Sequence, residues 1–146
     1  MIKPWLYALL SLALLASLLL GACGASPEPA APGMTPFNGY PWRDSYALGH
    51  DQVDDTHREF VELIDAMMRA DDDSFPGLMD RFIAHTREHF AQESALMARH
   101  AFPAVGCHER EHQEILDSTL AVRERVADGD LATGRYLVNL LGEWFP

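Results

Sequence analysis

The stretch EHFAQESALM, residues 88–97, decides the fold, because it reads as one amphipathic α-helix that carries polar groups among its apolar residues. His89 and Glu93 lie four residues apart in it, so both side chains occupy the same helical face, one turn from each other. The stretch HEREH repeats this spacing with His108 and His112. The sequence therefore poses the question of what these two pairs face.

Four segments repeat their apolar residues at the spacing of an α-helix, and no segment alternates for long enough to be a strand. Asp51 or Asp54 can cap the first helix, and a fourth helix begins near Asp130. Short links between the helices predict an all-α fold, an up-down-up-down four-helix bundle. The predicted helices cover about 52–70, 74–100 and 103–129, followed by one from about 130 onward.

The apolar residues around the two pairs turn both of them inward, and His57 falls on the apolar stripe of the first helix. A single inward histidine is more often a hydrogen-bonded core residue than a metal ligand. Glu93 is harder to explain in that way, because an unpaired buried carboxylate is costly. Nitrogen and oxygen ligands without thiolate suit iron, manganese or zinc, and five ligands exceed one tetrahedral zinc.

Three phrases, LGHDQVDDTHREFVELI, HFAQESALM and FPAVGCHEREH, resemble the hemerythrin family in order and spacing. The resemblance covers about residues 40–146 and implies a four-helix bundle with two non-haem iron ions that bind dioxygen reversibly. It further implies that His57 and His89 ligate one iron, that His108 and His112 ligate the other, and that Glu93 bridges both. It places aromatic and aliphatic side chains around an oxygen pocket: Phe60, Phe90, Met97 and Trp144.

The sequence departs from the family at GEWFP, residues 142–146. Family members continue the fourth helix into a histidine and an aspartate that complete the site. We expect a truncated fourth helix and a chain that is a fragment of a longer product, with a naturally degraded site as the alternative. His85, one turn before His89, is either a substitute ligand or a residue of the next packing layer.

Residues 1–22 form a separate segment with one cation, Lys3, and then an uncharged apolar run. This pattern is typical of a signal peptide, with a membrane anchor as the alternative, since residues 5–22 approach the length that spans a bilayer. The sequence LGAC, ending at Cys23, resembles the lipobox of bacterial lipoproteins and implies lipidation of Cys23. Residues 23–39, rich in Pro, Ala and Gly, are expected to form a flexible tether before the domain at 40–146.

The chain holds 22 acidic and 11 basic residues, which disfavours a nucleic-acid partner. No general base or nucleophile is apparent, so we expect a binding protein rather than an enzyme. The predicted function is dioxygen binding by a di-iron site, lipid-anchored to a membrane of the bacterial envelope and facing the periplasm, with the outer membrane as the expected location. A zinc- or iron-buffering protein is the first alternative, and a purely structural bundle is the second.

Overall fold

The computed structural model describes residues 39–145. The predicted signal peptide, the lipidation site at Cys23 and all of the predicted tether except Gly39 therefore lie outside the described residues. In the described part, no helix combines the length and the apolar character that crossing a membrane requires.

Four α-helices make up most of residues 39–145, and this range contains no strand. The predicted all-α fold and the four helix positions are confirmed, each to within about two residues at its ends. The aromatic arm before the first helix carries one short 3-10 turn, η1 (Asp44–Tyr46). The long helices are α2 (Asp51–Arg69), α3 (Phe75–Arg99), α4 (Val105–Ala127) and α5 (Leu131–Trp144).

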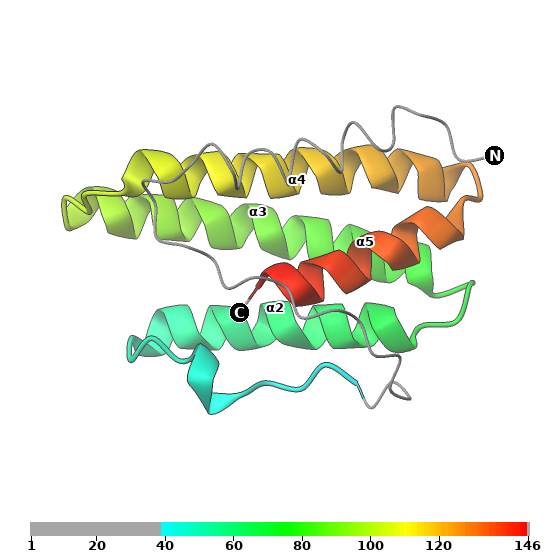
Figure 1. Cartoon of the computed structure of the whole chain (residues 1–146), viewed down its shortest axis with the longest axis horizontal. Coiled ribbons are helices and arrows are strands. Elements are labelled where there is room, and N and C mark those ends of the chain that lie inside the picture. Colours follow the sequence, from blue (N-terminus) through cyan, green and yellow to red (C-terminus); the bar gives the residue numbers. More distant parts are fainter. Residues whose placement is uncertain (1–38, 146) are drawn as a thin grey trace. The chain divides into compact units, whose positions relative to one another are not determined.

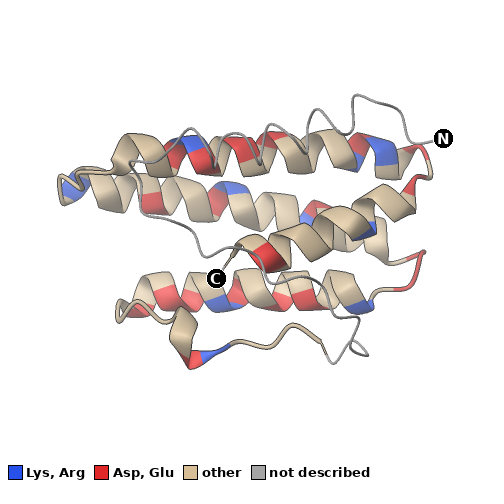
Figure 2. Cartoon of the chain, viewed as in Figure 1, with Lys and Arg blue, Asp and Glu red and all other residues tan. Residues whose placement is uncertain are grey.

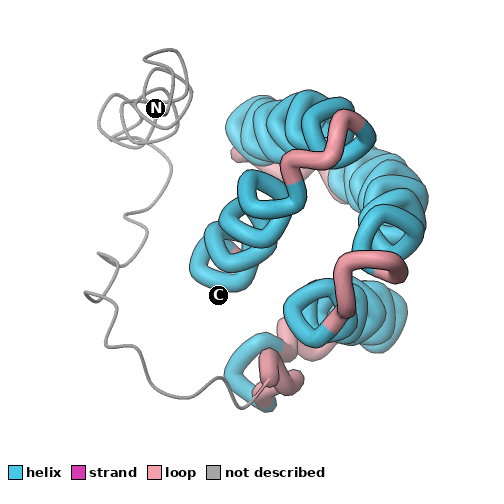
Figure 3. The backbone as a smooth tube through the Cα atoms, turned by 90° about the vertical axis from the view of Figure 1, so that its right-hand side faces the viewer, coloured by secondary structure: helices cyan, strands magenta, loops and turns pink. Residues whose placement is uncertain are grey.

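Successive helices run in opposite directions, as the short links require (Figure 1). Helix α3 packs against α2 and α4, and α5 closes the ring by packing against α4 and α2. Viewed along their axes, the four helices surround a common interior (Figure 3). This order brings the beginnings of α2 and α4 to the same end of the bundle as the end of α3.

The interior is filled by apolar side chains from all four helices. Gly134 of α5 shows how closely the helices approach, because a Cβ atom there would lie 2.6 Å from both Phe75 Cε1 and Val126 Cγ2. Such a distance lies well inside van der Waals contact, so α5 packs with its backbone against the core. The central cluster consists of Phe60, Ile64, Met67, Phe75, Met79, Phe82, Ile83, Val126, Leu137, Val138 and Leu141.

The arm that precedes α2 is held down by backbone hydrogen bonds. Asp54, which is buried, accepts N–H groups from Leu48 at 2.7 Å and Gly49 at 3.0 Å. The hydroxyl of Tyr40 donates to the carbonyl of Gly142 at 2.7 Å, which ties the arm to α5. The predicted capping of α2 by Asp51 or Asp54 is wrong, since the N-cap residue is His50 and it makes no side-chain cap. Asp54 instead turns back to the arm.

The outer faces of the helices carry most of the charge, and acidic side chains outnumber basic ones there (Figure 2). Several ion pairs link neighbouring helices, for example Arg123 of α4 to Asp80 of α3 and Arg135 of α5 to Asp72. Exposed pairs of this kind contribute roughly 0–1 kcal/mol each. The bundle is therefore held chiefly by its apolar interior.

Candidate metal centre

The predicted ligands come together because of the antiparallel helix order. His57 lies near the beginning of α2, and the pair His108 and His112 lies near the beginning of α4. His89 and Glu93 lie near the end of α3, which runs the other way. All five side chains therefore reach the same end of the bundle.

Glu93 is the centre of this cluster, and its two oxygens face different pairs of imidazoles. Oε1 lies 3.0 Å from His57 Nε2 and 3.3 Å from His89 Nε2. Oε2 lies 3.0 Å from His108 Nε2 and 3.2 Å from His112 Nε2. The carboxylate is thus the shared member of two triads, each with ligand atoms within 4.8 Å of one another.

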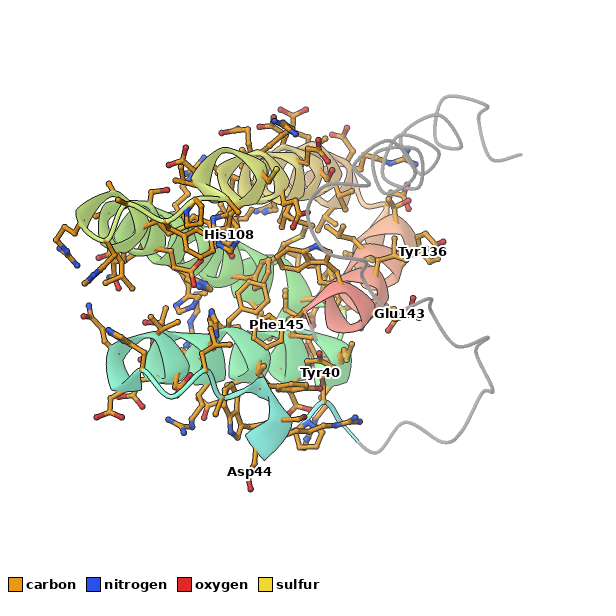
Figure 4. The ribbon with its side chains drawn as sticks, turned by 60° about the vertical axis from the view of Figure 1, so that its left-hand side comes forward. Tyr40, Asp44, His108, Tyr136, Glu143 and Phe145 are labelled. Carbon is orange, nitrogen blue, oxygen red and sulfur yellow. The ribbon has the colours of Figure 1, made fainter. Side chains whose placement is uncertain are left out.

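The two triads differ in their exposure to solvent. The side chains of His89 and His57 are 3% and 12% exposed, and that of His112 is 8% exposed. His108 is 40% exposed, although Figure 4 shows its side chain on the inner side of α4. The triad of His57 and His89 is consequently more deeply buried than the other triad, which is partly open.

The carboxylate and the imidazoles influence one another's protonation strongly. Burial raises the pKa of Glu93, but the four imidazoles around its carboxylate, that of His108 foremost, outweigh burial and hold this pKa well below its usual range. The hydrogen bond to Glu93 raises the pKa of His108. Burial lowers the pKa of His112 instead. Glu93 is therefore an anion at neutral pH, as a metal ligand must be.

Several buried nitrogens of the cluster lack a hydrogen-bond partner among the described residues. These are Nδ1 of His57, Nδ1 of His112 and both ring nitrogens of His89. His89 Nε2 lies near Glu93 but is not aligned for a hydrogen bond. Of these nitrogens only His89 Nε2 faces the carboxylate, and since buried polar atoms are nearly always satisfied, its lack of a partner there fits a site built for a cation.

Aromatic rings pack against the imidazoles and restrict their orientation. Phe90 stacks on His112 with ring centroids 3.6 Å apart and planes 3° apart. The ring centroids of Phe60 and His89 lie 5.7 Å apart, and those of Phe145 and His57 lie 5.3 Å apart. The rings therefore cover part of three of the four imidazoles.

One residue expected to line the oxygen pocket lies elsewhere. Trp144 is 39% exposed, and its neighbour Phe145 points inward instead (Figure 4). Phe145 was missed because helical spacing alone does not decide which of two adjacent aromatic residues turns inward at a helix end. Met97 is half-buried.

His85 packs in the next layer. Its Nδ1 lies 3.5 Å from Glu59 Oε2, and its ring centroid lies 5.8 Å from that of His89. It belongs to neither triad. Of the two readings of the sequence, packing is the one that the structure favours.

A small cleft reaches the buried triad from the side and was not predicted from the sequence. It lies between α2 and α3, where Gln52, Gln92 and Arg99 join His89 and Glu93 in its lining. Glutamines and an arginine on an exposed helical face carry no sequence signal for such a role.

Fold and site together define a class, the four-helix bundles that hold cations between histidines and a shared carboxylate. The family model of the Hemerythrin HHE cation binding domain matches residues 48–146. The chain therefore belongs to the hemerythrin family and is an iron-binding protein of hemerythrin type.

Two relatives are both named bacteriohemerythrin. The one from Ralstonia nicotianae is 43% identical over 104 residues, which cover 71% of this chain and 76% of the relative. The one from Stenotrophomonas maltophilia is 26% identical over 110 residues, covering 70% and 69% respectively.

Proposed function

We propose that the chain binds two non-haem iron ions and, through them, dioxygen. The observation that carries this proposal is the position of Glu93, whose two oxygens each face a different pair of imidazoles. A carboxylate shared by two triads suits a bridge between two cations better than a ligand of one. His57 and His89 would hold one iron, and His108 and His112 the other.

Two ferrous ions at this site would supply the two electrons that reversible dioxygen binding requires. The residues of the chain would hold the ions and limit the access of water to them. The rings of Phe60 and Phe145 cover the imidazoles of the buried triad, and Phe90 covers His112. A dry surround of this kind favours release of dioxygen over loss of a reduced product.

We further propose a binding role rather than an enzymatic one. The cleft beside the buried triad has a volume of about 20 Å³, which suits one water-sized group. An organic substrate would not fit next to the buried triad without rearrangement of α2 and α3. Small diatomic or triatomic ligands match this space.

The test is anaerobic reconstitution of the full chain with ferrous iron, followed by exposure to air. We expect about two irons per chain, the absorption spectrum of a bridged di-iron centre in air, and reversal of that spectrum on deaeration. Two irons without an oxygen-dependent spectrum would refute dioxygen binding. A single bound zinc with no spectral change would refute the iron assignment as well.

Metal buffering is the second candidate function, and the exposure of His108 favours it. A ligand that is 40% exposed can leave and rejoin a cation more readily than the buried imidazoles. Competition between zinc and iron, with a chromophoric chelator as the readout, separates the two candidates. Rapid exchange of both ions without an oxygen-dependent spectrum would favour buffering.

We also propose that Cys23 is lipidated and that the protein is anchored in the bacterial envelope, facing the periplasm, with the outer membrane as its location. The support is the sequence LGAC after an uncharged apolar run. Cys23→Ser should release the protein from membranes or leave it unprocessed. Normal processing with unchanged membrane retention would refute the proposal.

A further inference from the structure

The cleft between α2 and α3 connects solvent with the buried triad. Its inner wall includes the largely buried His89 and Glu93. Its outer wall includes three exposed side chains, Gln52 of α2 and Gln92 and Arg99 of α3. Because exposed and buried residues line the same space, the cleft is a route to His89 and Glu93 of the His57–His89–Glu93 triad, and it does not pass His108.

The polar groups of this lining are mostly occupied by their own neighbours. Gln92 donates its side-chain amide to Glu88 at 3.0 Å. The hydroxyl of Thr56 donates to the carbonyl of Gln52 at 2.9 Å. The side chains of Gln92 and Thr56 are thus partly fixed and carry no charge.

Arg99 is the cation of the lining. Among residues 39–145 no carboxylate lies within ion-pair distance of it, in contrast to Arg58, Arg69 or Arg123. It belongs to the last turn of α3, where a positive charge is also favoured by the helix dipole. In a chain of net charge −11, which repels anions in general, the mouth of this cleft is a local exception.

We propose that this cleft admits small monovalent anions to the His57–His89–Glu93 half of the metal site, and that Arg99 selects them by charge. The inference rests on the proposed iron site, because the bound cation is what the anion reaches. The space fits a ligand whose cross-section is that of one water molecule. Azide is a suitable probe of this class, and nitric oxide is a suitable uncharged probe.

The first experiment measures association rates by stopped flow on the iron-loaded full chain. Arg99→Gln should slow azide binding to the oxidised protein about threefold at low ionic strength, as expected for one unit charge at the mouth in a high dielectric. Salt should slow azide binding in the wild type and have little effect in the variant. Nitric oxide binding to the reduced protein should be the same in both.

Arg87→Gln is the matched control. Arg87 is another exposed arginine of α3, and it lines the groove on the α4 side of that helix. Its removal changes the net charge equally but leaves the cleft intact. Equal slowing of azide by both substitutions, or no slowing by Arg99→Gln, would overturn the inference.

A second experiment needs no iron. In the metal-free chain, a cysteine placed at Leu96, which also lines the cleft, is modified with anionic and cationic thiosulfonate reagents. Peptide mapping assigns each adduct to position 96. Adding Arg99→Gln should lower the ratio of anionic to cationic reaction rates about tenfold, since the two rates change in opposite directions. An unchanged ratio would overturn the inference.

Gln92→Cys provides the same readout at the mouth if Leu96→Cys does not fold. The two experiments also separate this inference from the proposed function. If the chain loads iron but Arg99→Gln does not change the rate of azide binding, only the charge selection by Arg99 is refuted. Failure to load iron refutes the proposed function, and the thiol ratio then still decides whether the cleft selects anions.

Discussion

Glu93→Gln is the substitution that tests the site most directly. The side chain keeps its size and shape, so the packing between α2, α3 and α4 is preserved. It loses its negative charge, and one of its two acceptor oxygens becomes an amide donor. Because each oxygen faces two imidazoles, either orientation of the amide turns a donor toward one whole pair.

The magnitude in the metal-free protein follows from the hydrogen bonds. Two of the four contacts, those of His57 and His108 at 3.0 Å, are aligned hydrogen bonds to a charged acceptor. A hydrogen bond to a charged group contributes roughly 1.5–3 kcal/mol, against about 1 kcal/mol for a neutral pair. Their weakening is partly offset, because a buried charge is removed. We expect a net loss of about 1–2 kcal/mol in the free energy of unfolding at pH 7.

The effect on metal-dependent stability is larger. A cation at a hundred times its Kd stabilises the folded state by about 2.7 kcal/mol per site, so two sites give about 5 kcal/mol. Both triads contain Glu93, so the substitution should reduce this gain to under about 1 kcal/mol. The gain is measured as the difference between urea unfolding curves with and without ferrous iron under nitrogen. Metal content per chain is determined in parallel.

Glu88→Gln is the control, because it removes the same charge from an exposed position of the same helix. It should change neither the metal content nor the iron-dependent stabilisation. If Glu93→Gln kept both quantities at wild-type values, the bridging position of Glu93 would carry no cation, and the reasoning would fail.

The remaining predictions concern one ligand, one helix contact and one arm contact. His108→Leu should lower metal content and also make the metal-free fold less stable, because the hydrogen bond from His108 to the charged Glu93 is lost. His100→Leu should leave metal content unchanged, and equal loss of metal in both variants would contradict the ligand assignment. Gly134→Ala should destabilise the fold by about 1–3 kcal/mol in urea unfolding, since its Cβ would lie 2.6 Å from two core side chains. Gly77→Ala is the control and should not destabilise the fold, because no atom lies within 4 Å of a Cβ there. Backbone N–H groups, that of Leu48 first, lower the pKa of Asp54. The stabilisation of the folded state by the ionised Asp54 side chain is therefore present above the usual aspartate pKa of 3.8 and is lost as the pH falls below it. The stability difference between wild type and Asp54→Asn should shrink over that range in acid titrations.

Much of the fold follows from local sequence pattern. The apolar period of residues 51–69 and 75–99 fixes both the helices and the faces that they bury, so ligands four residues apart could be placed on one face. Antiparallel order then brings three helices' ligands to one end. The cap of α2 was predicted wrongly, because Asp54 can bond either to its own helix or to the arm, and the arm offers two N–H groups.

Other features depend on distances between helices that spacing does not contain. The exposure of His108, the inward turn of Phe145 and the cleft beside Gln92 arise from how far the four helices lie from one another. A pattern of residues gives the face on which a side chain lies. It does not give the width of the gap into which that side chain points.

The unequal exposure of the two triads has a consequence for how the site fills. Glu93 cannot turn its Oε1 toward His57 and His89 without fixing where its Oε2 points, because both oxygens belong to one rigid plane. A cation in the buried triad would therefore keep the remaining oxygen directed toward His108 and His112. Its charge would also disfavour protonation of His108, whose pKa the bare carboxylate raises. A cation in the buried triad would thus remove a competing proton from the open triad while adding a repulsive charge beside it. In the proposed di-iron site, the shared carboxylate would screen that repulsion between the two cations.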